Sequence, residues 1–238
     1  MHNSYFQPAS APNSNMNPNM NSSMNSNMNQ AMRPIQTGMN QGMNANMNSG
    51  MNQQNMNHGG HEMFDAHEIL AGFISLLDQY VLFEPLIQDQ ELKRILHTQH
   101  HFITDLYNIS VEAFSTGMDP SHPTQTYKMD QNNQVVYGLQ KMSPKKPMTS
   151  INEVKDAGIS AYMLGLVKST GSLLAMTSLE ITNPVLRRMM ADSVPNFIEM
   201  GYELFLYQNK RHYYQVPQLA QQDMVQMLNS YAPSNYLV

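Results

Sequence analysis

The sequence contains no cysteine and no tryptophan. Without cysteine the chain cannot form disulfides, and it cannot bind iron–sulfur clusters or zinc through thiolates. A cysteine nucleophile is excluded for the same reason. We therefore expect the stability of any folded part to come from packing.

Charged residues are also scarce, with 13 Lys and Arg against 18 Asp and Glu and a net charge of −5. A chain with this balance does not attract polyanions, although Lys141, Lys145 and Lys146 form a small local basic cluster. We therefore expect neither nucleic acid nor an anionic membrane surface as a partner.

The N-terminus lacks a basic region followed by an apolar stretch, and no uninterrupted run approaches 18 apolar residues. These are the patterns of signal peptides and transmembrane helices. We expect no signal peptide and no membrane insertion, so the protein should remain in the compartment that made it.

Residues 1–60 differ in composition from the rest of the chain. They contain 16 Asn and 11 Met, and Arg33 is their only charged residue. Such a segment cannot bury enough apolar surface to order itself, so we predict a disordered arm. Its Met residues recur at every fourth position from Met16 to Met32 and from Met39 to Met51. Two interpretations stay open: self-association through Met and Asn, or a solvated arm without a partner.

Helical periodicity begins after Gly60 and continues over residues 61–238, a length suited to one domain. The pattern predicts four long helices and one short one, at about 61–83, 89–115, 151–180, 184–209 and 219–229. The apolar stripe of the first helix is predicted to consist of Phe64, Leu70, Phe73, Ile74, Leu77, Tyr80 and Val81.

Helix-capping residues support these boundaries. Asp89 is a candidate N-cap for the second helix, and Asn183–Pro184 is typical of a helix start. Ser150, with Glu153 three residues later, predicts a capping box at the start of the third helix. Small residues in that helix, including Gly171, predict close contact with a neighbouring helix.

The stretch from Thr116 to Thr149 is rich in Pro, Gln, Asn and Ser and predicts a long connection. Two helical hairpins joined by one long crossover are typical of the ferritin-like fold. The sequence therefore predicts an all-α, ferritin-like antiparallel four-helix bundle with a long crossover between its second and third helices.

Di-iron members of that fold carry Glu-x-x-His motifs on two of their helices. Here Glu91 is followed three residues later by Arg94, and Glu203 is followed by Leu206. We therefore expect no di-iron centre and a bundle interior filled with side chains.

The remaining metal hypothesis is a His/Glu site between the first two helices, formed by His67, Glu68 and His100. His97 and His101 fall on the polar face of the second helix, and surface histidines usually have no ligand. We expect no bound metal and no cofactor.

Nucleophilic catalysis has no sequence support either. Ser160 and Ser193 lie within predicted helices, outside any Gly-x-Ser-x-Gly turn, and no phosphate-binding Gly-rich loop is present. The sequence predicts a protein that is not an enzyme.

Residues 156–219 carry a recognisable set of motifs. Lys168 lies about ten residues before a Thr–Ser–x–Glu run, Asn183–Pro184 follows, and the fourth helix ends in a basic residue and the aromatic pair Tyr213–Tyr214. This stretch resembles the Coat F family of endospore coat proteins. The first two helices look like the companion half of the same ferritin-like unit.

The resemblance implies a structural protein that is made in the mother-cell cytoplasm and assembled into the spore coat. The implied partners are other spore coat proteins, with self-association as a further hypothesis. The alternative is a ferritin-like metal-binding or oxidase protein with a degenerate or His-based metal site.

Overall fold

The computed structural model describes residues 59–236, so the arm predicted over residues 1–60 lies almost entirely outside the described residues. The described part contains the α-helices α2 (Gly60–Phe83), α3 (Gln90–Thr116), α4 (Asp156–Thr177), α5 (Pro184–Lys210) and α6 (Gln221–Leu228). Two short 3-10 turns, Glu84–Leu86 and Ile151–Glu153, precede α3 and α4. Residues 59–236 contain no β-strand and one isolated bridge, between Tyr137 and Val216.

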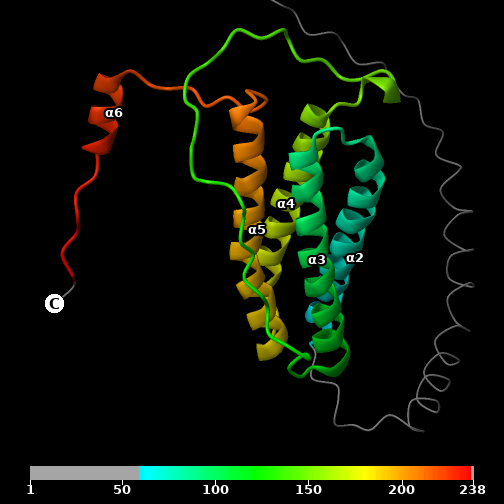
Figure 1. The fold of residues 1–238 in the computed structure, drawn as a ribbon. Coiled ribbons are helices and arrows are strands. Elements are labelled where there is room, and N and C mark those ends of the chain that lie inside the picture. Colours follow the sequence, from blue (N-terminus) through cyan, green and yellow to red (C-terminus); the bar gives the residue numbers. More distant parts are fainter. Residues whose placement is uncertain (1–58, 237–238) are drawn as a thin grey trace, which may run out of the picture. The chain divides into compact units, whose positions relative to one another are not determined.

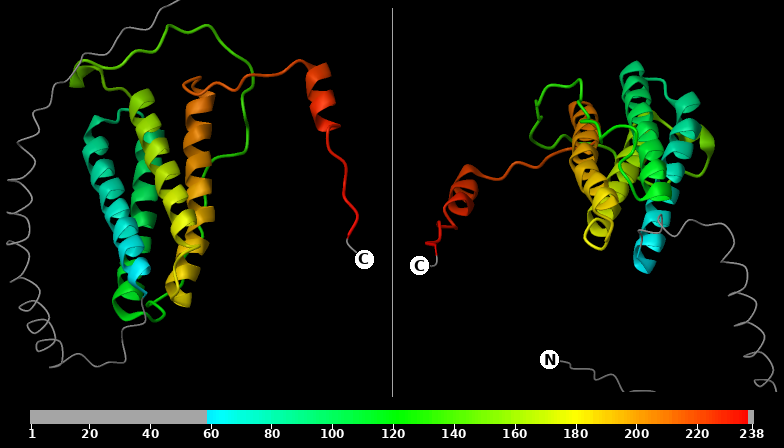
Figure 2. Two further views of the ribbon diagram at one scale, coloured as in Figure 1. Left: turned by 180° about the vertical axis from the view of Figure 1, so that it is seen from behind. Right: turned by 90° about the horizontal axis from the view of Figure 1, so that it is seen from below.

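The four long helices pack side by side around one hydrophobic core (Figure 1). The contacting pairs are α2 with α3, α4 with α5, α2 with α4, and α3 with α5, so each helix has two neighbours. Neighbouring helices run antiparallel, and the crossover of residues 117–150 passes from the end of α3 to the opposite end of the helices, where α4 begins (Figures 1 and 2).

Side-chain caps begin two of these helices. The Asp89 carboxylate accepts a hydrogen bond from the Glu91 N–H at 2.8 Å and caps α3. The Asn183 side chain accepts from the N–H groups of Val185 and Leu186 and caps α5. Gly117 ends α3 in the left-handed conformation, with φ of 67°, which glycine adopts without steric cost. These three helix boundaries therefore follow from local chemistry that the sequence already contains.

The predicted stripe of α2 is partly wrong. Phe73 and Tyr80 are buried, but Phe64, Ile74 and Val81 are exposed, with relative accessibilities of 76%, 45% and 60%. The buried face instead contains Ala66, Ile69 and Leu76, and Leu77 is only partly buried. Since α2 carries apolar residues on both sides, periodicity alone could not choose the face that packs inward.

The predicted start of the third helix is also wrong. Ser150 caps only the 3-10 turn Ile151–Glu153, and α4 begins at Asp156. The Asp156 carboxylate accepts hydrogen bonds from the backbone N–H groups of Gln88 and Asp89. The first turn of α4 is therefore attached to the connection between α2 and α3, a tertiary contact that the capping-box pattern does not encode.

Two segments of the described chain, Gly60–Leu86 and Asp156–Thr177, are long and apolar enough to cross a membrane by length and composition. Core helices pass the same test, and both segments contribute fully buried residues such as Phe73 and Met163 to the hydrophobic core. This composition is weak evidence for membrane insertion.

Two glycines of α4 should respond in opposite ways to replacement by alanine. A Cβ at Gly171 would lie 3.0 Å from the Cβ of Phe197 on α5, whereas a Cβ at Gly165 meets nothing within 4 Å. We expect Gly165→Ala to stabilise by about 0.5–1 kcal/mol through helix propensity. Gly171→Ala should destabilise by about 1–3 kcal/mol relative to that control, because the helices must move apart.

Urea denaturation of the two variants measures the difference in unfolding free energy. Equal stabilisation by both substitutions would contradict the close contact between α4 and α5 at Gly171.

Candidate functional site

The structure does not bring the predicted metal ligands together. His67 and Glu68 are exposed on α2, and the His67 ring lies edge-on against Phe114, with centroids 5.6 Å apart. Phe114 follows His100 by 14 residues on α3, which corresponds to about 21 Å along the helix at ~1.5 Å per residue. His100 therefore lies near the middle of α3, far along the helix pair from His67 near the start of α2.

No group of three or more His, Asp or Glu residues placed to hold a metal occurs within residues 59–236. His97 and His101 are exposed, as the polar face of their helix predicted. The ring nitrogen Nε2 of His97 lies 3.1 Å from the Glu84 carboxylate, on the surface.

The helical core instead contains a buried hydrogen-bond network, which we call the central network. It consists of Tyr80 on α2, Gln99 on α3, Glu203 on α5 and Tyr127 of the crossover. The Glu203 carboxylate accepts from the Gln99 amide at 3.1 Å and from the Tyr127 hydroxyl at 2.5 Å. The Tyr80 hydroxyl donates to Gln99 Oε1 at 2.7 Å.

Burial raises the pKa of Glu203, and the hydrogen bonds from Tyr127 and Gln99 only partly oppose this rise. Burial likewise raises the pKa values of Tyr80 and Tyr127 well above the usual range, so both phenols remain protonated hydrogen-bond donors. Each side chain in the central network is hydrogen-bonded to another member. The network thus links three helices and the crossover instead of presenting a reactive group.

Sequence reasoning missed this network. Glu203 was considered only as an iron ligand, and Tyr127 lies in a polar segment with no periodicity. The available signal was a glutamate on the apolar side of a helix, since an acidic residue is rarely buried without a partner.

The crossover is held to α5 and to the segment that follows it by three amide side chains, which we call the amide clamps. Asn196 accepts from the N–H of Tyr127 and donates to the carbonyl of Gln125. Asn209 accepts from the N–H of Val136 at 2.6 Å and donates to the carbonyl of the same residue at 3.0 Å. Gln215 binds both backbone groups of Gln140 in the same way. Each amide supplies one donor and one acceptor, as a neighbouring β-strand would.

A second buried carboxylate fixes the end of the helices where α2 begins. Glu62 accepts from the N–H of Thr182 at 2.7 Å, from its hydroxyl at 2.6 Å, and from the N–H of Asn183 at 2.8 Å. Asn183 in turn donates to the carbonyl of Gly117 at 3.0 Å. The start of α2, the end of α3 and the connection between α4 and α5 are thus joined at one point.

The opposite end is held by charged residues. Arg211 pairs with Asp89 at 2.5 Å and with Glu91 at 2.9 Å, and its guanidinium lies 4.0 Å from the centroid of the Tyr207 ring. Lys210 also pairs with Glu91. Burial alone would raise the pKa of Asp89, but the backbone N–H of Glu91 and the Arg211 guanidinium together lower it. These contacts attach the end of α5 to the start of α3.

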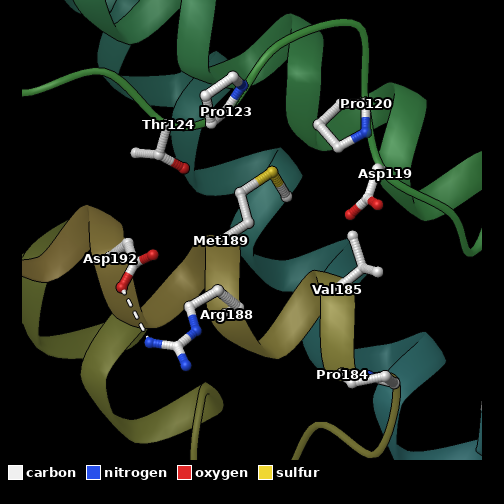
Figure 3. Close-up of a pocket in the computed structure, with 9 residues that line it drawn as sticks. All are labelled: Asp119, Pro120, Pro123, Thr124, Pro184, Val185, Arg188, Met189 and Asp192. Carbon is white, nitrogen blue, oxygen red and sulfur yellow. Dashed lines mark ion pairs between the residues drawn. The ribbon is translucent and has the colours of Figure 1, made fainter.

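Several hollows open on the surface, and α5 supplies half or more of the lining residues of two of them. One, of about 310 Å³, lies where the crossover leaves α3 and meets the start of α5, and Arg188 and Asp192 pair across its edge at 3.8 Å (Figure 3). Its lining is mixed: Asp119, Pro120, Pro123, Thr124, Pro184, Val185, Arg188, Met189 and Asp192. The other is an apolar groove of about 630 Å³ between α4 and α5. Neither joins the central network.

Replacing Glu203 by Gln should change the pH dependence of stability. An acid whose pKa is raised by folding binds more protons in the folded state, so stability falls as pH rises from its ordinary pKa to the raised value. Above that window, Glu203→Gln should gain stability relative to the native chain because it removes a buried charge.

Unfolding free energies by urea denaturation between about pH 4 and 9 cover the relevant carboxyl range. Glu199→Gln, on the same helix but outside the central network, controls for loss of a carboxylate. A constant difference between Glu203→Gln and the native chain at every pH would contradict burial of a charged Glu203.

Asn209→Ala should destabilise the protein by about 1–3 kcal/mol, because it leaves the backbone groups of Val136 without their partner. Asn133→Ala, at an exposed crossover position, is the matched control and should change stability by less than about 0.5 kcal/mol. Thermal and urea unfolding measure both changes. Equal small effects would mean that the crossover does not depend on the Asn209 clamp.

Comparison with known proteins identifies relatives of this chain. The Coat F domain model matches residues 155–217, which cover α4, α5 and the segment that follows them. The chain is 52% identical over 176 residues to the spore coat protein F-like protein YhcQ of Bacillus subtilis (strain 168), covering 74% of this chain and 81% of YhcQ.

A solved structure shares the fold. It is the putative spore coat protein BH2358 from Bacillus halodurans C-125, with a TM-score of 0.50 and 15% sequence identity. The match covers 69% of this chain and 96% of that protein. At this identity the likeness concerns the all-helical architecture only.

Proposed function

The chain belongs to the Coat F family of spore coat proteins, and from this membership we propose that it is a structural, non-catalytic component of the bacterial endospore coat. The observation that carries the proposal is the 52% identity to a spore coat protein F-like protein over most of both chains. The central network supports a structural role, because its polar groups bind one another and hold the crossover in place.

We further infer that the four long helices form a ferritin-like antiparallel bundle. The cyclic contacts, the antiparallel neighbours and the end-to-end crossover support this assignment. In di-iron members, inward carboxylates and histidines surround the metals. In this chain the inward positions Tyr80, Gln99 and Glu203 are joined by hydrogen bonds instead.

We infer a division into an Asn/Met-rich arm over residues 1–60 and a helical domain over residues 61–238. The composition of the arm, with its repeated Met and its single charge at Arg33, supports a role in contacts between chains. Other spore coat proteins are the expected partners, and a second copy of this chain is a further one. We also propose that the protein is synthesised in the mother-cell cytoplasm and then deposited on the spore.

A fluorescent fusion of the full chain, expressed from its own promoter in sporulating cells, tests this role. We expect the fluorescence to form a shell around the developing spore and to remain on purified, washed spores. Diffuse fluorescence throughout the mother cell after coat formation would contradict the proposal.

Two further fusions separate the parts of the chain. One lacks residues 1–58 and the other carries those residues alone. Shell formation by the first and not by the second would assign coat contacts to the helical domain. The reverse result would assign them to the arm.

A further inference from the structure

Methionine outnumbers leucine in this chain, although leucine is normally among the commonest residues. The chain has 23 Met and no Cys, so all its sulfur is in thioethers. Four Met of the described residues belong to the hydrophobic core, with relative accessibilities of at most 5%: Met163, Met189, Met190 and Met200. Six have relative accessibilities between 40% and 62%, and we call them the surface methionines: Met63, Met118, Met142, Met148, Met176 and Met227.

Packing does not require the surface methionines. None of them belongs to the hydrophobic core or to the partly buried residues that pack against it. Three lie in the crossover, outside any α-helix, and three lie in α2, α4 and α6. At the helical positions Gln, Lys or Glu would support the helix about equally well. What Met supplies at these positions, and a polar residue does not, is an apolar side chain with an accessible sulfur atom.

A thioether reacts with a peroxide without a metal or another cofactor. A lone pair of the sulfur attacks one peroxide oxygen, the O–O bond breaks, and that oxygen stays on the sulfur as a sulfoxide. The other oxygen leaves with the bonding electrons and takes up the proton of the first, which gives water or an alcohol. The sulfur is oxidised by two electrons, so each surface methionine removes one equivalent of peroxide.

The fold separates positions where this reaction is tolerated from positions where it is destructive. A sulfoxide is polar, so at an exposed position it remains hydrated, whereas in the core it would be a buried polar group without a partner. Met163 and Met200 are fully buried, so a peroxide reaches them only when the structure opens. Oxidation of the surface methionines should therefore leave the core intact.

We propose that the surface methionines are a sacrificial site for peroxides. The folded chain consumes one equivalent of hydrogen peroxide or of a small organic hydroperoxide at each of them and remains folded. This chemistry goes beyond the proposed structural role and belongs to the isolated chain. Only its use to a spore, the removal of peroxide within the coat, rests on the proposed function. The experiment uses purified protein, so its outcome is independent of where the fluorescent fusion is found.

The first measurement follows the native, full-length chain in excess hydrogen peroxide at neutral pH. Mass spectrometry of peptides gives the rate of sulfoxide formation at each Met. We expect the surface methionines to react at least about 100-fold faster than Met163 and Met200, because the core opens rarely. When only the surface methionines are oxidised, circular dichroism should show unchanged helical content and a cooperative thermal transition.

The second measurement compares two variants with the native chain. The surface variant replaces each surface methionine by Gln, which has similar length and helix propensity: Met63→Gln, Met118→Gln, Met142→Gln, Met148→Gln, Met176→Gln and Met227→Gln. The control variant keeps every Met and replaces six exposed aliphatic residues instead: Val81→Gln, Leu82→Gln, Leu139→Gln, Ile151→Gln, Leu179→Gln and Leu228→Gln.

Each protein is mixed with a reporter peptide that contains a single Met, and limiting peroxide is added. We expect the native chain and the control variant to protect the reporter equally. The surface variant should consume six fewer equivalents of peroxide per chain in the rapid phase, one for each thioether removed, and more of the reporter should be oxidised.

Four results would overturn the proposal. Equal oxidation rates at the surface methionines and at Met163 and Met200 would show that the fold does not separate the two sets. Loss of helical content when only the surface methionines are oxidised would show that they support the structure. Equal protection of the reporter by the native chain and the surface variant would show that they do not act as a sink. A changed oligomeric state of the surface variant alone would assign them to contacts between chains.

Discussion

The backbone of the crossover must form hydrogen bonds without belonging to any helix or sheet. Side chains of α5 supply the partners for these hydrogen bonds. Buried polar backbone groups are costly when they lack partners. Asn196 and Asn209 supply such partners to the crossover, and Glu203 anchors Tyr127 through its hydroxyl. The helix therefore packs apolar residues against its neighbours and polar side chains against the crossover. Its buried face could not be purely hydrophobic without releasing the segment that connects the two halves of the protein.

The two ends of the helices are held by different chemistry. At one end, Glu62 binds backbone N–H groups of the α4–α5 connection. At the other, Arg211 bridges Asp89 and Glu91, whose pKa values are lowered on balance although burial acts to raise them. Lowered carboxyl pKa values add stability above the ordinary pKa and lose it as pH falls, whereas the raised pKa of Glu203 acts in the opposite direction. The two kinds of site therefore oppose each other in their effect on stability as pH changes.

Local chemistry made part of this fold predictable from sequence. Asp89, Asn183 and Gly117 act at helix ends through their own backbone neighbours, so their roles are visible without tertiary structure. The buried face of α2 was not predictable, because Phe64 and Ile69 are equally apolar and only the surrounding helices decide between them. The central network was not predictable either, since Gln99, Tyr127 and Glu203 are brought together from positions as far as 104 residues apart. The resemblance of residues 156–219 to the Coat F family, in contrast, depended on residue types in order and was confirmed by comparison.

Because the chain is synthesised from its N-terminus, the amide clamps form later than the crossover that they bind. Tyr127 is made 69 residues before Asn196, its backbone partner. At about 5–20 residues per second, roughly 3–14 s pass between the two. During that interval α2 and α3 can pair, but the backbone groups of Tyr127 and Val136 lack their amide partners until α5 leaves the ribosome. Completion of this fold on the ribosome is therefore controlled by its fourth long helix, and a nascent chain interrupted before α5 presents the crossover and one face of the first hairpin uncovered.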